Sequence, residues 1–210
     1  MKFPRLILTF IIGLIAVCAC EKTPEDHNGP KPEGEKNDST EVVTKAEYAK
    51  GADISWITQM ENDGVKFYNS ADQEKEGTEL MKELGFNAIR LRVWVDPKDG
   101  WCAKEDVLEK AARAYNLGLR LMIDFHYSDF WADPGKQNPP AAWKDHDLTK
   151  LADAVGKHTE DVLQTLKDNG VSVEWIQIGN EVNNGMLWPA GKVQGQSAGN
   201  FITLFNTGSM

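Results

Sequence analysis

Between residues 48 and 210 the spacing of apolar residues switches repeatedly between two periods. Short runs with apolar residues at every second position predict strands, and longer segments with apolar residues every three or four positions predict helices. The predicted strands are Gly51–Trp56, Phe86–Val95, Leu119–Tyr127 and Val171–Asn180. The predicted helices are 71–85, 104–118 and 147–170, and a fourth begins at Ala198.

Two of these helices have a clear apolar face. In helix 71–85 the face holds Leu80, Met81 and Leu84, and Gly85 marks the end of the helix. In helix 147–170 it holds Leu148, Leu151, Val155, His158, Val162 and Leu166. Each helix therefore has one side to bury against a sheet.

Four strand–helix units in succession predict a parallel sheet with right-handed crossovers. Two architectures fit, a doubly wound open sheet and half of an eight-fold barrel. Polar and aromatic side chains gather where the predicted strands end, namely Trp94 and Asp96, then His126, Tyr127 and Asp129, then Asn180 and Glu181. This clustering favours the barrel, whose chemistry lies at that face, although a doubly wound sheet also binds ligands there.

The first 20 residues have the pattern of an export signal. Lys2 and Arg5 precede the apolar run Leu6–Val17, which is too short to span a bilayer. Ala19 and Cys20 then resemble the cleavage site of bacterial lipoproteins. That resemblance implies a lipid on Cys20 and attachment to the outer membrane at the cell surface. The alternative is an ordinary cleaved signal and a periplasmic or secreted protein.

Residues 21–47 are rich in proline, glycine and charge and have little to bury. This composition predicts a flexible linker, so that 48–210 would form the folded domain. Within that domain Cys102 is the only cysteine, which gives neither an internal disulfide nor a zinc site.

The composition narrows the ligand class. A formal charge of −9 argues against a nucleic-acid groove, which needs a basic surface, and is compatible with a neutral ligand. No strand is followed by a glycine-rich phosphate loop, and no histidine pair has zinc spacing, so we expect no cofactor and no metal. Seven tryptophans lie in the predicted domain, and indole rings cover the faces of sugars well.

Four segments together resemble glycoside hydrolase family 53. They are "GADISW", "GFNAIRLRVWVDP", "DFHYSDFWADPGKQNPPAAW" and "IQIGNEVNNGMLWP", in this order between residues 48 and 210. The family contains endo-β-1,4-galactanases, which cut arabinogalactan and pectic galactan. The resemblance implies a (β/α)8 TIM barrel, of which this sequence holds about the first four β/α units.

The resemblance also implies catalytic roles. Glu181, after Gly-Asn on the fourth strand, would be the general acid/base, Asn180 would bind the sugar 2-OH, and Arg90 would orient the nucleophile. Retaining glycosidases need a second carboxylate about 5–5.5 Å from the acid. In this family it would be a Glu after strand seven, so we expect that the sequence is a fragment, inactive and poorly stable alone.

Further residues are expected to bind the polysaccharide. They are Asp53, Trp56, Arg92, Trp94, His126, Tyr127, Asp129, Trp131 and Trp188. For three of them the residues leave an alternative open. Arg92 could form an ion pair in the barrel floor, Trp94 could fill the barrel, and His126 could be structural.

Two other functions remain open at this point. The protein could be another (β/α)8 endo-glycosidase, acting on mannan, xylan or glucan. It could instead be a non-catalytic surface lipoprotein that binds glycans through its tryptophans. We expect a monomer for the full-length protein.

Overall fold

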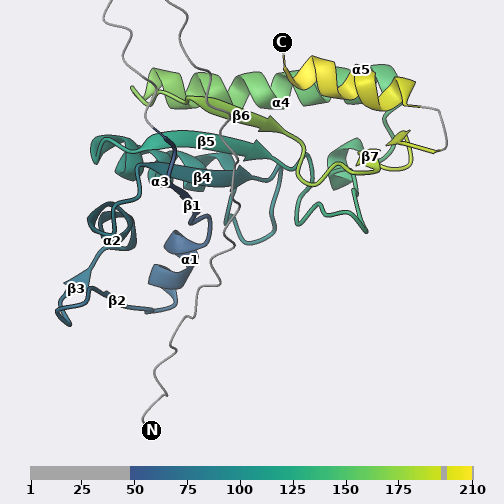
Figure 1. The fold of residues 1–210 in the computed structure, drawn as a ribbon. Helices are drawn as coiled ribbons and strands as arrows, with labels where there is room; N and C mark the ends of the chain where they lie inside the picture. Colours follow the sequence, from purple (N-terminus) through teal and green to yellow (C-terminus); the bar gives the residue numbers. More distant parts are fainter. Residues whose placement is uncertain (1–47, 195–197, 210) are drawn as a thin grey trace, which may run out of the picture. The chain divides into compact units, whose positions relative to one another are not determined.

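Four parallel strands form the centre of the fold. The computed structural model describes residues 48–194 and 198–209. The strands are β1 (Gly51–Asp53), β4 (Ala88–Val93), β5 (Arg120–Phe125) and β6 (Trp175–Ile178). They pair in the order β1-β4-β5-β6, which is also their order along the chain (Figure 1). A sheet that adds each new strand on the same side matches a barrel, whereas a doubly wound sheet reverses direction partway.

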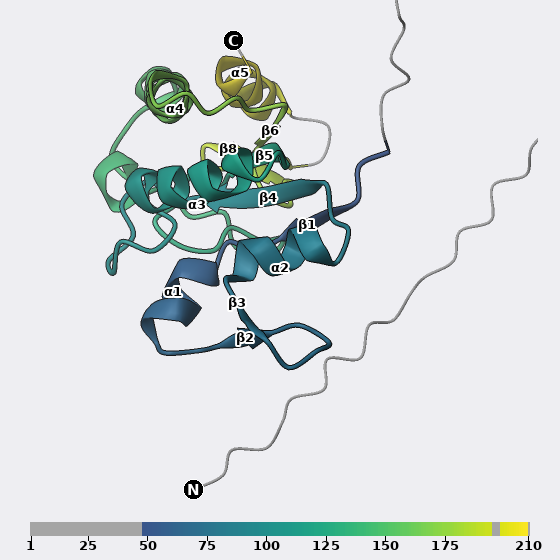
Figure 2. The same cartoon turned by 90° about the vertical axis from the view of Figure 1, so that its left-hand side faces the viewer.

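Helices follow each of these strands. They are α2 (Gly77–Glu83), α3 (Lys104–Asn116), α4 (Leu148–Asp168) and α5 (Gly199–Gly208). Figure 2 shows α4 and α5 side by side, with α3 next to them and α2 beyond it. Successive helices thus follow the order of the strands, as in a β/α barrel wall.

Smaller elements fill the connections. Between β1 and α2 lie a short helix, α1 (Ile57–Asn62), and a hairpin of β2 (Phe67–Tyr68) with β3 (Glu74–Lys75). A 3-10 turn (Ala141–Trp143) precedes α4. The strands β7 (Gly185–Met186) and β8 (Gly191–Lys192) form a second hairpin between β6 and α5.

Strand alternation gives the sheet two chemically different faces. Ile89, Leu91 and Val93 of β4 are fully buried in the apolar core with residues of α3 and α4. Each such side chain contributes about 1.5–3 kcal/mol when removed from water. The intervening residues of β4, Arg90 and Arg92, point to the opposite face. The hydrophobic effect therefore fixes which residues of each strand are left for chemistry.

The structure corrects two boundaries predicted from the sequence. The helix predicted over 71–85 is only Gly77–Glu83, because Glu74 and Lys75 pair with the preceding strand, and Leu84 is 59% exposed. The strand predicted over 171–180 is only Trp175–Ile178. Its side chain Ile176 is 40% exposed, because β6 is an edge strand in the part of the chain that the structure describes.

The predicted signal, the linker and Cys20 lie outside the described residues. Among the residues described, no helix has both the length and the apolar character needed to cross a membrane.

The partly buried His158 contributes to the pH dependence of the stability of the fold. The ring of His158 on α4 makes edge contacts with Phe125, Tyr127 and Trp143, at centroid distances of 5.9, 6.2 and 6.1 Å. Burial lowers the pKa of His158 to about 4, although the nearby Asp161 carboxylate opposes this and Lys104 adds to it. The folded protein therefore holds this imidazole neutral in mildly acidic solution.

We expect His158→Phe to reduce the loss of stability in acid. Between the unfolded pKa of about 6.5 and the folded pKa, the unfolded chain binds a proton that the folded chain does not, so stability falls as pH falls. Urea unfolding at pH 7 and pH 4.5 should show this loss about 2–3 kcal/mol smaller in the variant than in the wild type. The other titrating groups contribute equally to the loss in both proteins, so their contribution cancels when the two losses are subtracted. Equal losses in both would contradict the assignment.

Candidate active site

Arg90 joins the carboxyl ends of the strands on the polar face of the sheet. Its Nη1 donates to Asp53 Oδ2 at the end of β1 at 2.6 Å, and its Nη2 donates to Asp124 Oδ2 on β5 at 2.6 Å. The same Nη2 donates to Asn180 Oδ1, beyond β6, at 2.9 Å. Gln177 Oε1 on β6 lies 3.4 Å from Arg90 Nε. One planar guanidinium thus contacts residues from three neighbouring segments.

Strand register explains why these residues meet. Asp53 is paired with Arg90, and Arg92 is paired with Asp124, which is paired with Gln177. Residues in register on parallel strands point to the same face, and residues two apart on one strand do as well. Arg90 therefore reaches Asp53 beside it and Asp124 one step further along the neighbouring strand.

Asp53 is held as a carboxylate. Burial favours its neutral form, but hydrogen bonds from Ser55 and the neighbouring Arg90 outweigh burial, so the pKa of Asp53 lies below its usual value. Ser55 donates to Asp53 Oδ1 from its hydroxyl at 2.6 Å and from its backbone N–H at 3.0 Å. The Asp53–Arg90 pair therefore remains ionised through the neutral range.

His126 is fixed by donors on one side and by a carboxylate on the other. Its Nδ1 accepts from the Trp94 indole at 3.3 Å and from the Ala132 backbone N–H at 3.2 Å. Its Nε2 lies 2.9 Å from Asp124 Oδ2, which is a close electrostatic contact, although this nitrogen has no hydrogen-bond partner among the described residues. The fully buried Asp124 thus stands between His126 and Arg90.

Glu181 lies just beyond these residues and is exposed. Its backbone has φ = 49°, a left-handed conformation that is uncommon outside glycine. Gln137 Nε2 donates to the preceding carbonyl, that of Asn180, at 2.8 Å, and Asn180 Nδ2 donates to the Ala132 carbonyl at 2.8 Å. No hydrogen bond or ion pair involves the Glu181 carboxyl within the described part of the chain, so it is left to act on a ligand.

An aromatic pocket of about 640 Å³ lies at the same end of the sheet. Trp56 follows β1, Trp94 follows β4, and Phe130 and Trp131 follow β5. Its full lining is Trp56, Gln59, Trp94, Asp96, Pro97, Lys98, Asp99, Trp101, Asp129, Phe130, Trp131 and Ala141. Apolar ring faces with a few carboxylates at one mouth are suited to a ligand that carries both C–H surfaces and hydroxyls.

Several residues predicted to bind the polysaccharide are held by contacts within the protein. Tyr127 is 1% exposed in the core, and its hydroxyl is 2.8 Å from Thr159 Oγ1 on α4, so the expected contact with the cleft is wrong. Asp129 lines the pocket, but its oxygens accept backbone N–H groups of Asp96 and Ala141. Trp188 lies beyond Glu181, with its indole donating to the Asn184 carbonyl at 3.0 Å.

Sequence reasoning missed Asp124, Gln177, Gln137 and Ser55. Asp124 sits inside the apolar run "LRLMIDFHY", so hydrophobicity alone hides it. Its position two residues before His126 places both on one strand face, and this spacing could have revealed it. Gln177 is a polar residue inside the apolar strand "WIQI", and that interruption could have revealed it.

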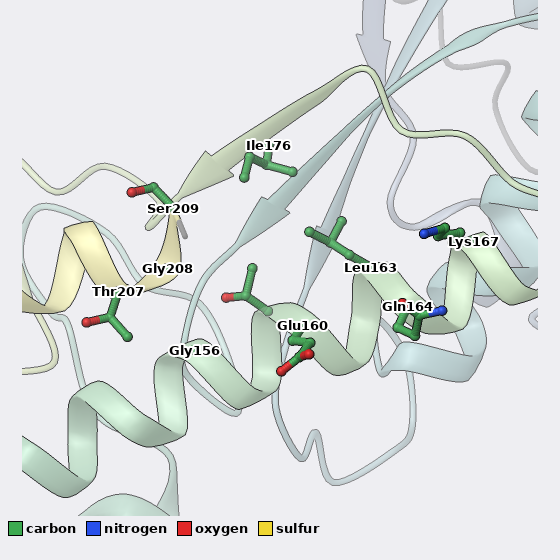
Figure 3. Close-up of a pocket in the computed structure, with 10 residues that line it drawn as sticks. Gly156, Glu160, Leu163, Gln164, Lys167, Ile176, Thr207, Gly208 and Ser209 are labelled. Carbon is green, nitrogen blue, oxygen red and sulfur yellow. The ribbon is translucent and has the colours of Figure 1, made fainter.

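A second hollow, of about 500 Å³, has no comparable chemistry (Figure 3). It lies beside the edge strand, between Ile176 of β6, Gly156 and Leu163 of α4, and Thr207 and Gly208 of α5. The charged residues at its border are Glu160 and Lys167, both on α4. It is a groove between β6, α4 and α5 on the side of the sheet that the helices cover.

Known proteins match this chain over almost all of its described residues. The family model described as glycosyl hydrolase family 53 matches residues 49–210. The probable arabinogalactan endo-β-1,4-galactanase A of Aspergillus terreus is 37% identical over 168 residues, which are 80% of this chain and 48% of that protein. The arabinogalactan endo-β-1,4-galactanase of Humicola insolens is 42% identical over 143 residues, 68% of this chain and 43% of that protein.

Comparison with solved structures agrees with the sequence comparison. A structure from work on two fungal β-1,4-galactanases superposes with a TM-score of 0.73 at 38% identity, covering 77% of this chain and 48% of that one. The fold class predicted from the sequence, a (β/α)8 barrel of which this chain contains four β/α units, is thereby confirmed. The chain spans less than half the length of the curated relatives described above.

We expect Asp124→Asn to destabilise the fold by about 3 kcal/mol, because it removes the buried negative charge that pairs with Arg90. Urea unfolding at pH 7 measures this free energy. Asp153→Asn is the matched control, since Asp153 forms an exposed pair with Lys157 at 2.7 Å. Equal and small effects of both substitutions would show that Asp124 does not hold the strand ends together.

Proposed function

The chain belongs to glycosyl hydrolase family 53, and we propose that it carries the acid/base half of an endo-β-1,4-galactanase active site. The relatives described above are named arabinogalactan endo-β-1,4-galactanases. The observation that carries the proposal is the free carboxyl of Glu181, directly after an Asn180 that Arg90 binds at 2.9 Å. A carboxyl without a protein partner, beside a rigid polar network, is suited to protonating a bound ligand.

In this proposal Glu181 protonates the glycosidic oxygen as the bond to the anomeric carbon breaks. Asn180 already uses its Oδ1 toward Arg90 and one Nδ2–H toward the Ala132 carbonyl. Its second Nδ2–H remains to donate to a sugar hydroxyl, in agreement with the expected contact to the 2-OH. Holding the amide on both sides fixes that donor before the substrate arrives, which preorganises the site.

We propose the retaining mechanism, which needs a second carboxylate on the opposite side of the anomeric carbon. The family resemblance assigns it to a Glu after strand seven, whereas the described part of this chain supplies four strands of the barrel, β1, β4, β5 and β6. The chain alone would then bind galactan without cleaving it. Arg90 already binds Asp53 and Asp124. It would orient the second carboxylate through an N–H donor of the guanidinium that these contacts leave available.

The aromatic pocket would hold a sugar ring of the polysaccharide. Indole faces pack on the C–H surfaces of a pyranose, while Asp96 at the pocket wall can accept hydrogen bonds from hydroxyls. A neutral galactan suits this wall better than an anionic polysaccharide, because the carboxylates of Asp96, Asp99 and Asp129 outnumber the one lysine of the lining, Lys98.

Glu181→Gln, in a protein that also carries the strand-seven carboxylate, should lower galactan hydrolysis at least about 100-fold, because general acid catalysis contributes on that scale. Proton NMR of the first product gives both the rate and the anomer, which should be the retained one. The unfolding midpoint should stay unchanged, since the carboxyl has no partner in the described structure.

Hydrolysis of mannan, xylan or glucan in preference to galactan would refute the substrate. An inverted anomer would refute the mechanism. Galactan binding by that longer protein without any cleavage would favour the glycan-binding alternative instead.

We also propose that the protein is exported and anchored by a lipid on Cys20. The support is the sequence alone, in which the run Leu6–Val17 is followed by Ala19 and Cys20. We expect labelled palmitate to be incorporated by the wild type and not by Cys20→Ser when each is expressed in a bacterial host. Cys102→Ser is the control and should keep the label, because Cys102 is buried. Absence of label in the wild type would leave the ordinary secretory signal.

A further inference from the structure

The guanidinium of Arg92 is enclosed by three tryptophans. Its Cζ lies 4.4 Å from the ring centre of Trp56, 4.4 Å from that of Trp131 and 5.2 Å from that of Trp94. Only 1% of Arg92 is exposed. All three rings also line the aromatic pocket, so the cation sits behind the pocket wall.

Hydrogen bonding compensates little of this buried charge, although the Cys102 thiol interacts with the guanidinium. In the part of the chain that the structure describes, Arg92 Nε and Nη2 have no hydrogen-bond partner. Nη1 is 3.9 Å from Asp53 Oδ1, which is an ion pair at the limit of contact. A guanidinium removed from water needs compensation, and the negative faces of aromatic rings supply it. The weak hydration and planar shape of arginine suit such a site better than the compact ammonium of lysine.

The three rings form a connected cluster around the cation. Trp56 and Trp131 have centroids 5.6 Å apart, and Trp94 and Trp131 have centroids 6.0 Å apart. They come from three different strand ends, so the backbone does not tie them to one another directly. The Trp94 indole donates to His126, and the Arg92 backbone N–H donates to Ser55 Oγ at 2.9 Å. The cation is the group common to all three rings.

We propose that Arg92 is a positioning residue, which holds Trp56, Trp94 and Trp131 in the orientation that binds a neutral pyranose ring. The arginine itself does not touch the sugar, because the rings cover it. This inference rests on the proposed function for the identity of the ligand. The arrangement of the rings around the cation is a separate claim, and it is measurable in the free protein.

The test compares the full chain with Arg92→Met, Arg92→Lys and the control Arg120→Met. Arg120 lies at the other end of β5, where its guanidinium is 4.3 Å from the Trp175 ring centre. The control therefore also removes an arginine from a tryptophan face, away from the pocket. Three quantities are measured: affinity for β-1,4-galactotetraose by calorimetry, acrylamide quenching of tryptophan fluorescence without ligand, and the thermal midpoint.

Arg92→Met should weaken galactotetraose binding about tenfold, which corresponds to about 1.4 kcal/mol. It should also increase quenching, because the rings lose their common partner and admit the quencher. Arg92→Lys should change the affinity and the quenching less than Arg92→Met does, since the charge remains. The thermal midpoint of Arg92→Met should stay near that of the wild type, because removing a buried cation offsets the lost attraction to the rings. A purely structural role would instead lower the midpoint and leave the affinity of the folded protein unchanged.

Wild-type affinity together with wild-type quenching in Arg92→Met would overturn the proposal, as would equal losses in Arg120→Met. If Arg92→Met does not fold, Arg92→Lys decides through the same two readouts, because it keeps the charge and loses the planar contact. If the wild type binds no galactotetraose, the proposed ligand fails while quenching still decides the role of Arg92. Tight binding of digalacturonate would overturn the neutral-ligand assignment.

Discussion

A single arginine side chain, that of Arg90, joins the carboxyl ends of the strands, and the rest of the site depends on this contact. Parallel strands bring their ends to one edge, but they do not by themselves fix the side chains there. Arg90 does so by bonding Asp53, Asp124 and Asn180 at 2.6–2.9 Å. Because Glu181 directly follows Asn180, its backbone is fixed by the same contact, while its carboxyl remains free.

The two faces of the sheet divide structure from chemistry. Residues Ile89, Leu91 and Val93 bury against the helices, and the residues between them form a polar inner face. That inner face carries two arginines with different roles. Arg90 meets carboxylates and an amide, whereas Arg92 meets three ring faces. The same residue type thus organises a polar site and an aromatic wall two positions apart.

Much of this arrangement could be predicted from the sequence where periodicity was strong. The helices α3 and α4 lie within a few residues of the predicted ranges 104–118 and 147–170, and a glycine follows each of them. The hairpin of β2 and β3 was missed, since two-residue strands are too short to show a period. The resemblance places Tyr127 in the cleft, yet alternation turns adjacent residues to opposite faces, and Tyr127 packs in the core.

The site itself was only partly predictable. Motif residues such as Asn180 and Glu181 were found because they interrupt an apolar run, while Asp124 was hidden inside one. The enclosure of Arg92 depends on rings from three separate segments, and sequence spacing does not reveal such a cluster.

The most direct test of the account is a crystal structure of the Glu181→Gln chain with β-1,4-galactotetraose. The account predicts a glycosidic oxygen within hydrogen-bond distance of residue 181 and a galactose ring packed on the tryptophans around Arg92. A sugar bound away from both, in the groove between α4 and α5 for example, would contradict it.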